Sequence, residues 1–142
     1  MWADIVLRAE RQHAVELLAW SALSLIMATA SLVATRGRRG ESALLAGFAA
    51  QLSFWALAIA AIGAFEWHGL AMRDLSSAAR LERFMWARAG LDVGIMGIGA
   101  AIGGASHLLA RRQGGVGAGV AIAAHGLALL VIDLRLIAVI AR

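Results

Sequence analysis

Four long apolar stretches alternate with short polar segments along this chain of 142 residues. The stretches cover roughly residues 14–35, 43–65, 85–110 and 116–141. A bilayer core of about 30 Å is crossed by about 20 helical residues, so each stretch is long enough to span it. The pattern therefore predicts four membrane-spanning helices in a single transmembrane domain, residues 1–142.

The segments that join the apolar stretches predict how the helices are connected. Residues 36–40 and 111–115 are short and rich in Arg and Gly, which is typical of tight turns between antiparallel helices. The longer connection, residues 66–84, interleaves apolar and charged residues and has Trp67 near one end and Trp86 just beyond the other, which favours an amphipathic helix at the membrane interface. We therefore expect an all-α integral membrane four-helix bundle, made of two antiparallel hairpins with an interfacial amphipathic connection.

Composition supports this class and excludes several functions. Apolar residues make up 61% of the chain and the mean hydropathy is +0.78, whereas a soluble domain is about half apolar. All 13 basic residues are Arg, and they are spread over loops that flank apolar helices rather than forming one basic face. This distribution indicates membrane lipids and not nucleic acid as the partner. The absence of Cys excludes disulfides, thiolate chemistry and Cys-ligated metal centres.

Further features of the sequence indicate how the chain is inserted and in which membrane it lies. Residues 28–30 (Ala-Thr-Ala) resemble a signal-peptidase site, but the acidic residues Asp4 and Glu10 precede the apolar run, so we interpret this run as a retained span. The tight turns carry five Arg against one Glu, which places the turns in the cytoplasm and both termini outside. Use of Arg alone, with abundant Ala and Gly, favours a bacterium with a G+C-rich genome. We expect a multi-pass protein of the bacterial inner membrane.

Glycine is concentrated in the second half of the chain, where small residues recur four positions apart. Such spacing lets helix backbones approach closely within a membrane. It is compatible with packing inside one bundle and with a face for a dimer or another partner. The candidate helix-packing residues are Gly90, Gly94, Gly99, Gly103, Gly119 and Gly126.

Ionisable residues within the apolar stretches are the candidate functional residues, because burying a charge in hydrocarbon costs several kcal/mol. They form a candidate polar layer of Glu16, Arg88, Asp92, Asp133 and Arg135. Asp92 and Asp133 lie about 20 residues on either side of the second turn, so antiparallel helices hold them at one depth, roughly 30 Å from that turn and near the terminal face of the bundle. Glu16 lies at a similar distance from the first turn.

Helical phase predicts which of these charges meet. Arg88 and Asp92 are four positions apart and share a face. The glycine stripes of the last two helices should face each other and bring Asp133 towards Arg88. Arg135 lies about 200° around its helix from Asp133, so it should point to Glu16 or to a lipid phosphate. The layer is either an internal salt-bridge network that sets helix register, or a polar pocket for an ion, a lipid head group or a small substrate.

The four His residues raise the question of haem. Two His ligands must lie at one depth, but His107 and His125 are separated by roughly 10 Å in depth, so we expect no cofactor and no metal. His125 is instead expected to make an interhelical hydrogen bond. No catalytic motif is present, and we expect no enzyme activity.

The last sixty residues resemble an uncharacterised family of small four-span bacterial membrane proteins. The similarity rests on Gly90-Leu91-Asp92-Val93-Gly94 in the third helix and on the segment from His125 to Asp133 in the fourth. This chain has Arg88 where that family usually has Asn, Ile95 for Tyr and His125 for Gln. The resemblance implies that Asp92 and Asp133 are the signature acids of the family, and it implies no activity.

Two functional hypotheses follow. The first is a non-enzymatic accessory or assembly subunit that packs against a larger bacterial membrane complex, such as a photosynthetic or respiratory one, because glycine-rich helix faces suit association with other subunits. The alternative is a small homodimeric transporter or channel that uses membrane carboxylates such as Glu16.

Overall fold

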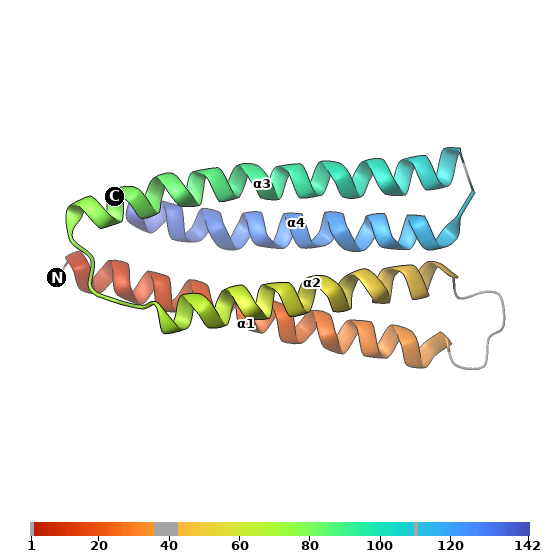
Figure 1. Ribbon diagram of the computed structural model, residues 1–142, viewed down its shortest axis with the longest axis horizontal. Coiled ribbons are helices and arrows are strands. Elements are labelled where there is room, and N and C mark those ends of the chain that lie inside the picture. The colour runs from red at the N-terminus through yellow and green to blue at the C-terminus, as the bar shows by residue number, and fades with distance from the viewer. Residues whose placement is uncertain (1, 36–42, 110) are drawn as a thin grey trace.

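A computed structural model describes residues 2–35, 43–109 and 111–142. The chain forms four long helices that lie side by side along the long axis of the molecule (Figure 1). They are α1 (Trp2–Thr35), α2 (Ala43–His68), α3 (Leu75–Leu108) and α4 (Gln113–Ile140). Neighbours in sequence run antiparallel, and both termini lie at the same end of the bundle. The predicted all-α four-helix bundle is confirmed.

The surface of the bundle is apolar. Each of the four helices is long and apolar enough to cross a membrane, yet only 17% to 44% of the residues in its most apolar window are buried against other helices. Most residues of these windows are therefore at least partly exposed, and lipid or another apolar surface has to cover them. These features define a multi-pass membrane protein.

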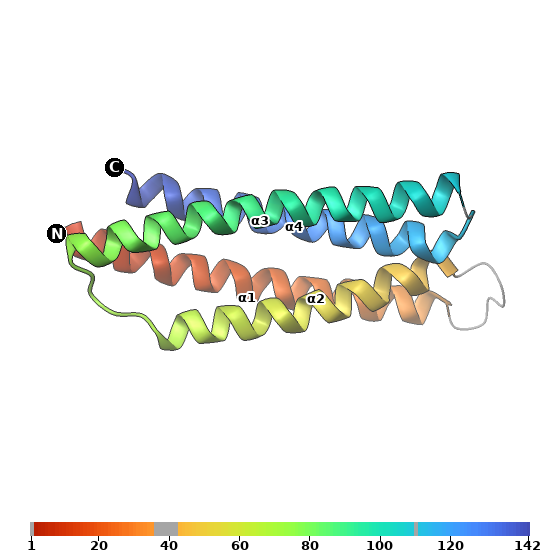
Figure 2. The same cartoon turned by 45° about the horizontal axis from the view of Figure 1, so that its top comes forward.

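At the end of the bundle that holds both chain termini, here called the terminal end, the helices begin and end at residues other than those predicted. Residues 66–84 do not form a separate amphipathic helix, because α2 continues to His68 and α3 already begins at Leu75. The carboxylate of Asp74 accepts a hydrogen bond of 2.7 Å from the backbone N–H of Ser77, and this N-cap starts α3. The amphipathic pattern belongs instead to the first turns of α3. The connection that remains is extended and lies at the end that holds the termini (Figure 2).

At the other end of the bundle, the second of the two expected turns lies between α3 and α4. The first expected turn, residues 36–40, lies outside the described residues. In the second, Arg111 adopts a positive φ of 49°, and the backbone N–H of Arg112 donates a hydrogen bond of 2.9 Å to the carbonyl of Ser106. This bond reverses the chain and makes α3 and α4 an antiparallel hairpin.

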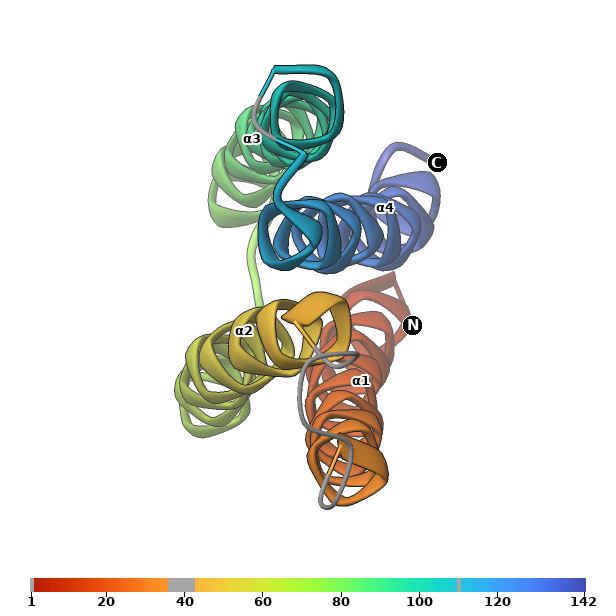
Figure 3. The same cartoon turned by 90° about the vertical axis from the view of Figure 1, so that its right-hand side faces the viewer.

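α4 is the central helix of the bundle. It packs against each of the other three helices, whereas α3 packs extensively only against α4 within the described residues. The end view shows α4 between α3 on one side and the α1–α2 hairpin on the other (Figure 3). α3 is therefore peripheral, and most of its surface does not contact the other helices among residues 2–35, 43–109 and 111–142.

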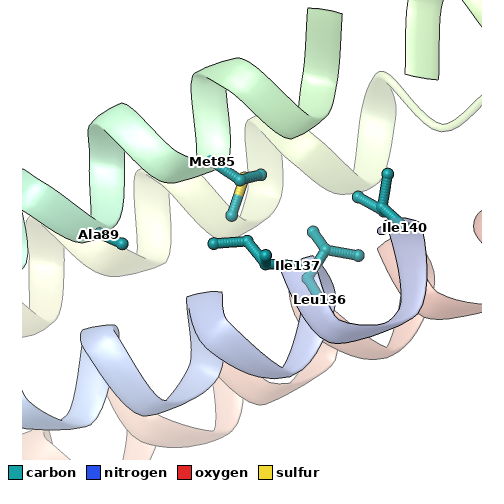
Figure 4. Packing of buried hydrophobic residues seen from close by; sticks show 5 residues of the cluster. All are labelled: Met85, Ala89, Leu136, Ile137 and Ile140. Carbon is teal, nitrogen blue, oxygen red and sulfur yellow. The ribbon is translucent and has the colours of Figure 1, made fainter. Parts of the chain in front are cut away.

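Three apolar clusters along α4 join these layers. At the terminal end, Met85 and Ala89 of α3 meet α4 (Figure 4). In the middle, Leu17, Ile59 and Leu129 bring together α1, α2 and α4. Towards the turns the cluster consists mainly of small side chains, including Ala28, Ala49 and Ala121. Small residues allow the helix backbones to come close, and close packing is the main source of helix association in lipid.

Candidate functional site

Each of the four helices contributes one ionisable side chain to a closed ring of ion pairs, here called the charged ring: His13, Glu66, Arg88 and Asp133. His13 Nδ1 lies 2.8 Å from Glu66 Oε2, and His13 Nε2 lies 2.9 Å from Asp133 Oδ1. Arg88 closes the ring, with Nη1 on Glu66 Oε1 and Nε 2.9 Å from Asp133 Oδ2. Bases and acids alternate around it, so every neighbouring pair is attractive.

Two members of the charged ring, His13 and Asp133, are buried, Glu66 and Arg88 are partly buried, and the charges of the ring balance. Asp133 is 0% and His13 is 3% exposed. Both ring nitrogens of His13 face carboxylate oxygens, and only the doubly protonated imidazolium can donate to both. Two cations then face two anions. Such balance is required, because an unpaired buried charge costs several kcal/mol.

Within the charged ring, the contact between Arg88 and Asp133 lacks the aligned hydrogen bond that the other three contacts have. Although Arg88 Nε is 2.9 Å from Asp133 Oδ2, that oxygen accepts no well-directed hydrogen bond from the described residues. The two groups attract each other as charges, while the aligned hydrogen bond of Asp133 comes from His13. Asp133 of α4 is therefore held by a hydrogen bond to His13 of α1 and by the charge of Arg88 of α3.

Asp92 lies beside the charged ring and is not a member of it. Its side chain neighbours Asp133, it is 2% exposed, and its Oδ2 has no hydrogen-bond partner among the described residues. The expected ion pair between Arg88 and Asp92 does not form in the described part of the chain, because Arg88 extends to Glu66 and Asp133 instead. The predicted approach of Arg88 to Asp133 is found.

Two further ion pairs flank the ring. Arg73 binds Glu10 through two hydrogen bonds, one of them 2.9 Å long from Nη2 to Oε2. Arg135 points away from the ring and lies 3.3 Å from Glu16, as its helical phase predicts. Glu16 and Arg135 therefore form a separate pair on the other side of His13 and do not join Arg88, Asp92 and Asp133.

His13 separates two cavities near the terminal end of the bundle. The first has a volume of about 250 Å³ and lies between the end of α2 and the start of α3, two helices that pack little against each other. Its polar wall consists of Glu10, His13, Glu66 and Arg73. The second has a volume of about 220 Å³, lies between α1 and α4, and is lined by Gln12, His13, Glu16 and Arg135, together with apolar residues.

The candidate glycines divide into two groups. A Cβ atom on Gly99 or Gly119 would collide with backbone atoms of the facing helix, one on Gly126 would lie 2.7 Å from the carbonyl oxygen of Asp92, and one on Gly103 would touch Gly119. These four positions hold α3 against α4. Gly90 and Gly94 do not take part in this packing, because an added Cβ would meet no atom of the described residues within 4 Å, and for them the alternative of a partner face remains. They lie on the exposed face of α3.

His125 also differs from its expected role. Its Nδ1 hydrogen-bonds the carbonyl of Ala121 in the same helix at 2.9 Å, and no interhelical hydrogen bond forms within the described residues. The ring packs instead between two indoles, edge-on to Trp20 and stacked on Trp55, with centroid distances of 5.7 and 6.2 Å. His125 thus joins α1, α2 and α4 by aromatic packing.

The sequence analysis did not identify His13 or Glu66 as members of a polar site, and Glu66 falls in the segment 66–84 that was expected at the membrane interface. A signal was available for Glu66, because it continues the buried stripe of α2 formed by Leu52, Ile59 and Gly63 at spacings of three, four and seven residues. His13 similarly lies on the same face as the buried residues Glu10 and Leu17. The described residues contain no group of three His, Cys, Asp or Glu side chains arranged to hold a metal ion.

The fold and the site define a four-helix membrane protein whose helices are linked by a buried ring of alternating charges. Comparison with known families shows that the chain belongs to a family of unknown function, DUF6992, whose model matches residues 16–134. Glu66, Arg88, Asp92 and Asp133 lie inside the matched region, while His13 precedes it. No curated protein and no solved structure matches the chain.

Proposed function

We propose that this protein is a non-enzymatic accessory or assembly subunit of a larger complex in the bacterial inner membrane, and that it associates with its partner through α3. The observation that carries this proposal is the exposed glycine face of α3. Gly90, Gly94 and Gly97 lie on the outer side of the helix, and a Cβ atom on any of them would meet nothing within 4 Å.

This outer face continues along most of the helix. Small residues follow one another at spacings of three and four positions, which aligns them on one side of a helix. They are Ala87, Gly90, Gly94, Gly97, Ala101 and Gly104. Exposed bulky side chains flank the stripe, with Leu91 and Ile98 on one side and Trp86 and Val93 on the other. The result is a shallow groove with apolar walls.

Such a groove suits a second helix. Lipid tails are as apolar as leucine, so helices associate in membranes chiefly where small residues allow close backbone contact. On the inner face of α3, Gly99 and Gly103 allow such close contact with the backbone of α4. The outer face has a similar row of small residues that contacts no other helix among the described residues, which supports a role in holding another subunit.

Two substitutions, one in the outer groove and one elsewhere, provide the test. Gly94→Leu adds bulk to the outer groove, whereas Ala50→Leu adds similar bulk to an exposed position of α2. We expect tagged wild-type protein and Ala50→Leu to co-purify with larger subunits from native membranes. Gly94→Leu should keep its helical content and lose those subunits. Wild-type protein that purifies alone would overturn the proposal.

A second candidate is a small homodimeric transporter or channel. The observation that favours it is that carboxylates line both cavities, Glu10 and Glu66 in the first and Glu16 in the second, since membrane carboxylates are the usual carriers of protons in transporters. Flux through proteoliposomes would test it with Glu16→Gln and Asp92→Asn. Unchanged flux in both variants would remove this candidate.

A further inference from the structure

The first cavity, between the end of α2 and the start of α3, has a polar inner wall and an apolar rim. Glu10, His13, Glu66 and Arg73 form the inner wall. Phe65, Leu70, Leu81 and Phe84 are among the apolar residues around them. Phe65 of α2 is 81% exposed and Phe84 of α3 is 60% exposed, so the rim is continuous with the outer surface of the bundle. A molecule can therefore enter sideways from the lipid.

The charges of the wall indicate a neutral ligand. Glu10 is paired with Arg73, and Glu66 is bound by both His13 and Arg88. An incoming ion would find no unpaired countercharge and would lose its hydration, which is unfavourable. The cavity thus favours an uncharged head group.

Hydrogen-bonding capacity indicates what that head group carries. Each carboxylate oxygen of Glu66 accepts one bond within the charged ring and has a second lone pair. Glu66 is also the ring member most open to the cavity, with its side chain 25% exposed. Arg73 uses Nε and Nη2 for Glu10, which leaves Nη1 to donate. A hydroxyl group fits both, because it donates to a carboxylate and accepts from a guanidinium.

The volume limits how much of the ligand is enclosed. At about 250 Å³ the cavity is smaller than the roughly 300–1,000 Å³ of pockets that enclose a drug-sized molecule. Only a head group fits, and its chain would lie outside along Phe65 and Phe84. We propose that this cavity binds the hydroxyl-bearing head of a neutral membrane lipid, either an isoprenoid hydroquinone or a diacylglycerol.

Calorimetric titration of the purified full chain in detergent would test this site with two probes, a decyl-substituted hydroquinone and dioctanoylglycerol. The methyl ethers of both serve as matched ligands that cannot donate a hydrogen bond. We expect at least one probe to bind, and its methyl ether to bind about tenfold more weakly or worse, as the loss of a hydrogen bond to a charged group implies. If only one of the two probes binds, that result shows whether the lipid is a hydroquinone or a diacylglycerol.

Substitutions in the two cavities test whether the probe binds in the first one. Leu81→Trp adds bulk at the wall of the first cavity without altering the charged ring, and Val139→Trp does the same at the second. Binding should be lost in Leu81→Trp and kept in Val139→Trp. If Leu81→Trp does not fold, Leu70→Trp in the connection blocks the same cavity. No binding of either probe, equal binding of a methyl ether, or undiminished binding by the blocked variants would overturn the proposal. None of these outcomes bears on the outer groove of α3, which tests the accessory role separately.

Discussion

His13 and Asp133 are 120 positions apart in sequence, yet Nε2 of the first lies 2.9 Å from Oδ1 of the second in the buried interior. This contact joins the first helix to the last. Because His13 also binds Glu66 and Asp133 also faces Arg88, it is part of a ring that links all four helices.

Removal of Arg88 should destabilise the bundle strongly. Arg88→Ala leaves Glu66 and Asp133 without their common cation, and breaking a buried pair in this way costs about 3–5 kcal/mol. Arg135→Ala removes a cation whose side chain is 66% exposed and should cost about 0–1 kcal/mol. Arg88→Asn should be milder than Arg88→Ala, since an amide still donates hydrogen bonds. Unfolding by denaturant in detergent measures the free energy of unfolding of the three variants and of the wild type. Equal stability of wild type and Arg88→Ala would show that the ring is solvated.

His13 should carry a proton on both ring nitrogens. Its two partners are carboxylates, which accept hydrogen bonds and donate none when ionised. Nitrogen-15 NMR of histidine-labelled protein distinguishes an imidazolium from a neutral ring, with the exposed His68 and His107 as internal references. The resonance is assigned by its loss in His13→Asn. A neutral single tautomer at this position would contradict the ring of alternating charges.

Bulk at Gly126 should separate α3 from α4. A Cβ atom there would lie 2.7 Å from the carbonyl oxygen of Asp92 and 2.8 Å from the backbone nitrogen of Met96, neither of which can move without shifting the helix. Gly126→Leu should therefore cost at least the roughly 1–3 kcal/mol of an overpacked core. Gly97→Leu makes the same substitution on the open face of α3 and should leave stability unchanged. Similar thermal stability of both variants would exclude close contact at Gly126.

The start of α3 should loosen in acid. Hydrogen bonds from Ser77, and then from Ser76, lower the pKa of Asp74 to about 2 from its ordinary 3.8. A lowered pKa means that the cap is fully present above pH 3.8 and is lost as the pH falls from 3.8 to about 2. Hydrogen exchange of the Ser77 amide should accelerate over that interval, relative to the intrinsic exchange rate. Asp74→Asn should remove this pH dependence, and persistence of the dependence in that variant would assign it to another group.

Much of the architecture follows from the sequence alone. The lengths of the apolar stretches predict four helices because a bilayer-spanning helix has a minimum length, and this requires no knowledge of how they pack. Helical periodicity also predicts that Arg88 approaches Asp133, and that Arg135 points away from Asp133, to Glu16 or to a lipid phosphate. The first contact depends on the turn that joins α3 to α4 and on residues that share a face, which are local properties of a hairpin. The second prediction fixes only the direction of Arg135, and the packing of α1 against α4 supplies Glu16 as its partner.

The remaining contacts required the tertiary structure. Gly90 and Gly94 have the same spacing as Gly99 and Gly103, yet only the second pair meets α4, because spacing identifies a face of the helix without identifying what covers it. The entry of His13 and Glu66 into the ring depends on how the α1–α2 hairpin is rotated about α4. That rotation is set by close packing between distant helices, such as Leu17 and Ile59 with Leu129, and it has no counterpart in the local periodicity of any one segment. The sequence determined the helices and their neighbours, while packing between the hairpins decided which charges meet.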